Sequence, residues 1–262
     1  NRFQGGASII MDVTSGEILA LTSFPEYDHS AFSRGSPDSI HRANTDPQKP
    51  LLNRAIAGLY APGSIVKPIF AAAALQEGLI DPETEILSTG QLVVPNPYDP
   101  TKPTIFRDWK AHGWVDMRRA LAVSSDVYFY TIGGGFGSQK GLGIALLDTY
   151  ARAFGLGTLT GIPLLGESVG VIPTPSWKAE VFGEDDPWRI GDTYITAIVQ
   201  FGFQITPIQA VRYTAAIAHG GRLLTPQLTL DGDVRRRSVG ISDEKLEIIR
   251  EGMRASVTDG GT

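Results

Sequence analysis

A serine and a lysine three residues apart, Ser64 and Lys67, are the pair of side chains in this sequence best suited to covalent catalysis. At the start of a predicted helix, this spacing places both side chains on one face, one turn apart. A neutral lysine amine can take the proton of a serine hydroxyl, and burial lowers a lysine pKa toward that neutral state. The amides and dipole at the helix start would favour the oxyanion formed when the serine attacks a carbonyl. The pair therefore predicts serine-based acyl transfer.

The surrounding segment separates this pair from a chance occurrence of the same letters. Alone, a Ser-x-x-Lys string is ordinarily a helix-capping serine followed by an exposed lysine. Here Pro62 and Gly63 turn the chain into the run SIVKPIFAAAALQEG, which has four alanines and ends at Gly78. Other elements can pack closely around such a helix, and a surface lysine would not need this setting.

The elements expected to position the pair are an N-terminal hairpin and several helices. Two apolar runs at residues 7–13 and 17–23, separated by Thr-Ser-Gly, predict the hairpin. Residues 24–53 and 81–107 lack periodicity and are predicted to be long loops. Caps and stop signals predict further helices at 116–132, 139–154, 206–218 and 243–257. This order of elements predicts an α+β fold with helices grouped against an antiparallel sheet.

Composition excludes several classes of protein. The 262 residues include no cysteine, which excludes disulfides, thiolate catalysis and thiolate-bound metals. The net charge of −5, with RRR at 235–237 as the one basic cluster, argues against nucleic acid as a partner. No run approaches the ~18 apolar residues of a membrane span, and the first residues lack the order of a signal peptide. Because the chain begins on a strand-like run and stops at DGGT, we expect both ends to be cuts in a longer protein.

Ordered blocks along the chain resemble the class B penicillin-binding proteins. The stretch NRAIAGLYAPGSIVKPIFAAAAL is very similar to the active-site segment of that family, which carries Ser-x-x-Lys. MDVTSGEILALTSFPEYD resembles the hairpin before it, and SSDVYFY, GDTYITAIVQFGFQITPIQAVRYTAAIAHGG and EGMRASVTDGGT resemble later blocks in the right order. The resemblance covers residues 5–262. It implies the α+β fold of penicillin-binding proteins and serine β-lactamases, with an antiparallel sheet packed with helices and the last strands missing.

The second motif of the family falls on Ser124, Ser125 and Asp126. The resemblance implies that Ser124 relays a proton to the leaving amine, and that Ser125 and Asp126 position Lys67 or the substrate. Many family members have asparagine at the position of Asp126. An aspartate there resembles the pattern of the elongation-type subclass, often called penicillin-binding protein 2. Beside Lys67, Asp126 would fix the amine in place and raise its pKa. Taken alone, the three residues are an ordinary N-cap for the following helix.

The third motif, Lys-Thr-Gly, is missing. No lysine is followed by Thr-Gly or Ser-Gly; the lysines are at 49, 67, 102, 110, 140, 178 and 245. In the family this motif lies on a strand soon after the DGGTA-like block, so truncation at Thr262 is the expected reason. That strand supplies a second oxyanion-hole amide, a donor typically worth ~3 kcal/mol of barrier. We therefore expect residues 1–262 to be one incomplete transpeptidase domain, without an N-terminal anchor and pedestal domain, and to be acylated poorly.

Asp108 and His112, in FRDWKAHGWV, are the remaining candidate pair. The segment resembles one that contributes to a zinc site in some elongation-type proteins, but without cysteine that ligand set is incomplete. A structural role in a loop is the favoured interpretation, and we expect no metal and no organic cofactor. GGGFG at 133–137 lacks the features of a phosphate-binding loop and predicts a turn.

The function implied by the resemblance is that of a peptidoglycan D,D-transpeptidase. Ser64, deprotonated by Lys67, would attack the penultimate D-Ala carbonyl of a stem peptide, and an amine of a neighbouring stem would resolve the acyl-enzyme. β-Lactam antibiotics would acylate the same serine. The implied partners are a SEDS-family membrane glycosyltransferase and cell-wall elongation proteins, with the domain anchored by a single span on the outer face of the bacterial inner membrane. A D,D-carboxypeptidase, a serine β-lactamase, a β-lactam sensor and a non-catalytic binding module remain as alternatives.

Overall fold

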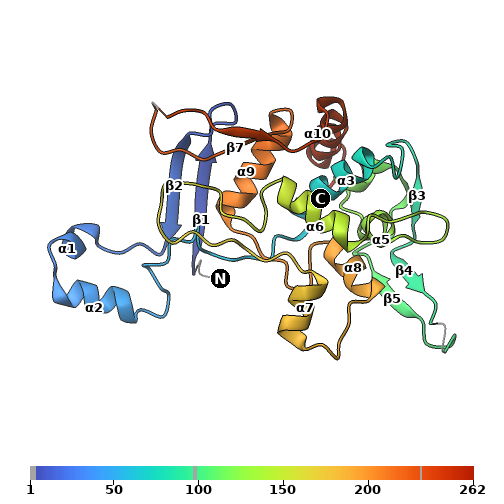
Figure 1. The fold of residues 1–262 in the computed structure, drawn as a ribbon, viewed down its shortest axis with the longest axis horizontal. Helices are drawn as coiled ribbons and strands as arrows, with labels where there is room; N and C mark the ends of the chain where they lie inside the picture. The colour runs from blue at the N-terminus through green and yellow to red at the C-terminus, as the bar shows by residue number, and fades with distance from the viewer. Residues whose placement is uncertain (1–3, 97–98, 231) are drawn as a thin grey trace. The chain divides into compact units, whose positions relative to one another are not determined.

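The computed structural model describes residues 4–96, 99–230 and 232–262, which divide into two compact units (Figure 1). Unit 1 comprises Asn1–Tyr60, Gly155–Gly170 and Gln204–Arg237, and unit 2 comprises Ala61–Phe154, Val171–Phe203 and Ser238–Thr262. All five predicted site residues therefore lie in unit 2. Within the described ranges, no helix has both the length and the apolar character that crossing a membrane requires.

Unit 1 is built on the predicted hairpin, with a helix packed against it (Figure 1). Its strands pair antiparallel with a bulge between Ile10 and Met11, and α9 contacts both β1 and β7. Thr206 caps the start of α9 with a capping box. Its side chain accepts from the Gln209 backbone N–H, and the Gln209 side chain accepts from the Thr206 backbone N–H. The elements of this unit are β1 (Gly6–Met11), β2 (Ile18–Phe24), α1 (His29–Ser33), α2 (Pro37–Thr45), α9 (Pro207–Ala218) and β7 (Arg222–Leu224). Strand β8 (Arg236–Ser238), whose first two residues lie in this unit, pairs with β7.

Unit 2 surrounds the alanine-rich helix α3, of which every residue from Lys67 to Leu75 is buried. Because the alanine side chains are small, neighbouring helices can approach closely, and α3 packs against α4, α5, α6 and α10. The elements of this unit are η1 (Gly63–Val66), α3 (Lys67–Gln76), β3 (Ile86–Ser88), β4 (Gln91–Val94), β5 (Thr104–Arg107), β6 (Gly113–Val115), α4 (Met117–Ala122), α5 (Asp126–Gly134), α6 (Gly143–Ala153), α7 (Pro175–Phe182), α8 (Ile190–Ala197) and α10 (Asp243–Thr258). Strand β3 pairs antiparallel with β6, and β4 with β5.

The α+β class is confirmed, but three element predictions are wrong. The loop predicted at 24–53 contains α1 and α2, and the loop predicted at 81–107 contains β3, β4 and β5. The helix predicted over 116–132 is two helices, α4 and α5, separated at Val123–Ser125. Ser124 in that break has a φ of 54°, in the left-handed region that a right-handed helix cannot contain. The break therefore places Ser124 in a turn between the two helices.

A glycine permits the close approach of α5 and α8 within unit 2. A Cβ added at Gly133 would lie 2.3 Å from the Cβ of Ala197, which is far inside van der Waals contact. We expect Gly133→Ala to lower the free energy of unfolding by about 1–3 kcal/mol, because overpacking forces the helices apart. Urea unfolding of Gly133→Ala, Ala197→Gly and the double variant measures this. The double variant should be more stable than the sum of the two single effects predicts, and simple additivity would show that the two positions do not clash.

Candidate active site

Ser64 lies in the short 3-10 turn η1, which leads directly into α3. The sequence predicted an α-helix from Ser64 onward, but α3 begins at Lys67, whose backbone N–H donates to the Ser64 carbonyl. Side chains at i and i+3 eclipse in a 3-10 turn, so the spacing still places both residues on one side. Ser64 is exposed whereas Lys67 is 1% exposed. Within the described residues no hydrogen bond joins the two side chains, so the serine hydroxyl remains open to a substrate.

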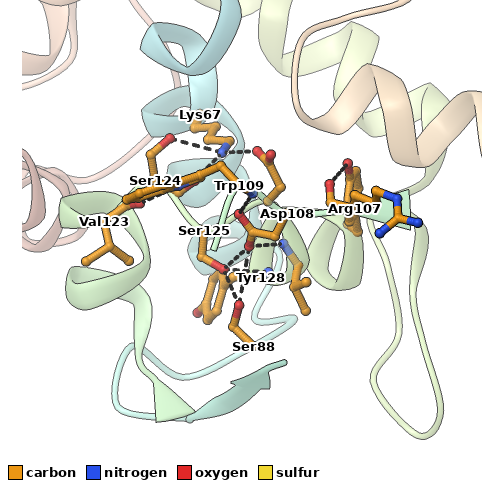
Figure 2. Close-up of polar contacts among 12 residues, drawn as sticks. Lys67, Ser88, Arg107, Asp108, Trp109, Val123, Ser124, Ser125 and Tyr128 are labelled. Atoms are coloured by element: carbon orange, nitrogen blue, oxygen red, sulfur yellow. Dashed lines mark hydrogen bonds and ion pairs between the residues drawn. The ribbon is translucent and has the colours of Figure 1, made fainter. Parts of the chain in front are cut away.

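The amine of Lys67 is held by three oxygen atoms of the second motif (Figure 2). Its Nζ lies 2.8 Å from the Ser124 carbonyl, 3.2 Å from Ser124 Oγ and 2.6 Å from Asp126 Oδ1. The ring of Phe129 lies below it, 5.2 Å from Nζ to the ring centroid. The structure therefore brings Lys67, Ser124 and Asp126 together.

Burial shifts the pKa values of Lys67 and Asp126 in opposite directions. The pKa of Lys67 is lowered, because burial disfavours the ammonium by more than the charge and hydrogen bond of Asp126 favour it. The pKa of Asp126 is raised, because burial disfavours its carboxylate by more than Lys67 stabilises it. The expectation that Asp126 raises the Lys67 pKa is correct for this one contribution, although the net direction is downward. A lowered lysine pKa is what a general base acting on a serine requires.

Ser125 is a structural residue of the turn. Its side chain caps α5 by accepting from the Tyr128 backbone N–H, as expected for an ordinary N-cap. Its Oγ also lies 3.0 Å from both Ser88 Oγ and Asp108 Oδ2, and the residue is fully buried. The capping interpretation thus applies to Ser125, which caps α5, whereas Ser124 and Asp126 contact Lys67.

Asp108, for which the sequence favoured a structural role in a loop over a zinc site, is a buried hydrogen-bond acceptor. Its side chain is fully buried, and Oδ2 accepts from Ser125 and from the backbone N–H of Val127 at 3.0 Å, while Oδ1 accepts from the Trp109 backbone N–H at 2.8 Å. His112 Nε2 lies 3.6 Å from Oδ1. Protein donors contact both Asp108 oxygens, and the described residues contain no group of three His, Asp or Glu side chains placed to hold an ion.

Trp109 is a second residue of this region that contacts the chain beside Ser124, although it is 58% exposed. Its indole N–H donates to the Val123 carbonyl at 3.2 Å, immediately before Ser124. Nothing in the local sequence distinguishes this tryptophan from the three others. Its place just after β5 became visible only in the structure, because residues 81–107 were predicted to be a loop.

Comparison with known proteins identifies the family. A profile described as the penicillin binding protein transpeptidase domain matches residues 6–262. The peptidoglycan D,D-transpeptidase MrdA of Haemophilus influenzae is 37% identical over 226 residues, which are 85% of this chain and 33% of that protein. The solved penicillin-binding protein PBP2 from Helicobacter pylori is 34% identical, with a TM-score of 0.83 over 97% of this chain and 47% of that one.

A complex between PBP2 and MreC, also from Helicobacter pylori, matches with 34% identity and a TM-score of 0.81 over 95% of this chain and 44% of that chain. The chain spans about a third of the length of the curated relatives it matches. The match along nearly the whole chain, together with a serine and a lysine spaced for acyl transfer, shows that the chain belongs to the penicillin-binding protein transpeptidase family, with proteins of the PBP2 and MrdA type among its relatives.

Proposed function

We propose that the protein is a peptidoglycan D,D-transpeptidase that acts through an acyl-enzyme on Ser64. The observation that carries the proposal is the buried Lys67 amine, which is held by Ser124 and Asp126 one turn after an exposed serine. The names of the relatives support the reaction, since they are D,D-transpeptidases. The substrate is then a peptidoglycan stem peptide that ends in D-Ala-D-Ala.

In the acylation half of the reaction, neutral Lys67 takes the proton of Ser64 while Oγ attacks the penultimate D-Ala carbonyl. A C–O bond forms, and the C–N bond to the terminal D-Ala breaks. The departing amine receives its proton through the Ser124 hydroxyl, which lies 3.2 Å from Lys67 Nζ and so can pass on the proton that Lys67 holds. The first amides of a 3-10 turn have no partner inside it, so the backbone N–H of Ser64 is available to the oxyanion.

In the second half, an amine of a neighbouring stem peptide attacks the ester and forms the cross-link. Its proton returns through Ser124 and Lys67 to Ser64, which restores the starting state. A β-lactam undergoes the first half only. Because its amide is part of a ring, the leaving nitrogen stays attached to the acyl group on Ser64 after the ring opens. Stable labelling by penicillin is therefore the expected consequence of this mechanism.

The solved complex of a related PBP2 with MreC supports a role within a protein assembly, and the resemblance of Asp126 to the elongation-type subclass points to cell-wall elongation. In this proposal the whole protein has a single membrane anchor, its transpeptidase domain lies on the outer face of the inner membrane, and a SEDS-family glycosyltransferase supplies the glycan strand. The Lys-Thr-Gly motif and the pedestal domain remain predictions for the whole protein.

The test is to treat the full-length protein with a fluorescent penicillin and to locate the adduct by mass spectrometry. We expect a stable adduct on the peptide that contains Ser64, and cross-linked dimers when a stem-peptide donor is supplied with an amine acceptor. Hydrolysis of the donor without dimers would indicate a D,D-carboxypeptidase, and rapid loss of the adduct a β-lactamase. A stable adduct with no turnover of the donor would indicate a sensor. Absence of any adduct would exclude the proposal and leave a binding module.

A further inference from the structure

Two neighbouring residues hold the chain on both sides of Ser124 (Figure 2). On one side, the Trp109 indole N–H donates to the Val123 carbonyl at 3.2 Å. On the other side, Asp108 Oδ2 lies 3.0 Å from Ser125 Oγ and accepts from the Val127 backbone N–H at the same distance. We call Asp108 and Trp109 together the clamp.

The turn between these contacts is in a conformation that needs support. Ser124 is not glycine, yet its φ is 54°, a left-handed conformation that costs an L-residue stability. In this conformation both the carbonyl and the hydroxyl of Ser124 reach Lys67 Nζ. If the turn relaxed to an ordinary helical φ, at least one of these two oxygens would leave the amine. Contacts that hold Val123 and Ser125 in place therefore also hold the two Ser124 oxygens that accept hydrogen bonds from Lys67.

We propose that the clamp is a positioning device for the acyl-transfer reaction, which keeps Ser124 strained against Lys67. Neither Asp108 nor Trp109 acts on the reacting atoms; each acts through the backbone or side chain next to Ser124. The inference rests on the proposed function, since it assigns these residues to the geometry of that site. Its consequence is that loosening the clamp slows the chemical step in molecules that remain folded, because misplacing a proton relay by a fraction of an ångström lowers the rate.

The variants that test the clamp differ in how much of it they remove. Trp109→Phe keeps an aromatic ring and removes only the N–H donor. Asp108→Asn keeps one oxygen for Ser125 and Val127, whereas Asp108→Ala removes every acceptor. The matched controls are Trp114→Phe, a neighbouring tryptophan that is 62% exposed, and Asp116→Ala, which removes the aspartate that caps α4. In the described residues, neither control residue forms a hydrogen bond or an ion pair with Val123–Val127.

The measurement is the rate of acylation by a fluorescent penicillin in the full-length protein, as a function of penicillin concentration and well below the melting temperature of each variant. We expect the maximal rate to fall about fivefold in Trp109→Phe and about 100-fold in Asp108→Ala, with Asp108→Asn between the wild type and Asp108→Ala. The half-saturating concentration should change much less. Asp116→Ala should lower the melting temperature yet keep the wild-type maximal rate.

The outcomes separate this inference from the function on which it rests. A wild-type protein that forms no adduct would overturn the proposed function itself. A wild-type protein that is acylated normally, together with a folded Trp109→Phe variant of the same maximal rate, would overturn the clamp. Trp109→Phe also decides the case if Asp108→Ala fails to fold, since it leaves the buried carboxylate and its hydrogen bonds intact.

Discussion

Replacing Lys67 with methionine should slow the acylation of Ser64 by a fluorescent penicillin about 1,000-fold or more. Methionine fills most of the space of the buried lysine stem, but it has no nitrogen to accept the serine proton. A positioned general base typically contributes 10²- to 10⁴-fold, and here no other amine in the described residues contacts the second motif. Stopped-flow measurement of the acylation rate, with thermal melting as the check on folding, gives the result directly.

Lys67→Arg distinguishes between two possible roles of Lys67, that of a general base and that of a fixed positive charge. Arginine can keep an ion pair with Asp126, but it stays protonated at any pH the protein survives. If Lys67 acts as the base, the arginine variant should be as slow as the methionine variant. An arginine variant with near wild-type rates would show instead that Lys67 serves by its charge alone.

Lys178 offers a matched control for both variants. It is also a buried lysine, at 2% exposed, and its Nζ lies 2.8 Å from Asp192 and 3.2 Å from Asp186. Its pKa is raised, because those two carboxylates favour the ammonium by more than burial disfavours it, whereas the pKa of Lys67 is lowered. Lys178→Met should therefore reduce stability, since it removes a buried ammonium from Asp186 and Asp192, but the folded fraction should be acylated at the wild-type rate.

The proposed nucleophile and base, Ser64 and Lys67, could be singled out from the sequence because their relation is local. Ser64 and Lys67 lie three residues apart, and both a 3-10 turn and an α-helix place such residues on one side. The placement of Ser124 was only half predictable. Resemblance marked the residue, but helical propensity over 116–132 hid the break, because the left-handed φ of Ser124 is imposed by tertiary contacts.

Asp108 was a candidate in the sequence, but its contacts could not be predicted from a single sequence. Its importance comes from donors contributed by β3 and α5 that are 17 to 20 residues away along the chain. No local pattern indicates such a convergence, and residues 81–107 just before Asp108 were predicted to be a loop because their three short strands carry no clear alternation. In the same way, α1 was missed because a helix of 5 residues has too few turns to show a period.

Asp126→Asn should move the rising limb of the pH dependence of acylation toward lower pH. The rate depends on the fraction of Lys67 that is neutral, so it rises with pH up to the Lys67 pKa. Asp126 raises that pKa in two ways, by its negative charge and by the hydrogen bond at 2.6 Å, and both oppose the larger effect of burial, which lowers it. Asparagine carries no charge, so burial is less opposed, the pKa of Lys67 falls further, and the amine becomes neutral at a lower pH.

The same substitution should lower the plateau of the profile about 10- to 100-fold, because a charge-assisted hydrogen bond that fixes the amine is lost. The sign of the shift identifies the base, since the two candidate groups respond differently. If Lys67 is the base, the profile keeps a rising limb and that limb moves to lower pH. If the base were instead the Asp126 carboxylate, whose pKa burial raises, then Asp126→Asn would remove the titrating group and flatten the profile. A pH series of acylation rates for the wild type, Asp126→Asn and Lys67→Met therefore assigns the proton acceptor. Only a lysine base predicts that the rising limb shifts in Asp126→Asn and is lost in Lys67→Met.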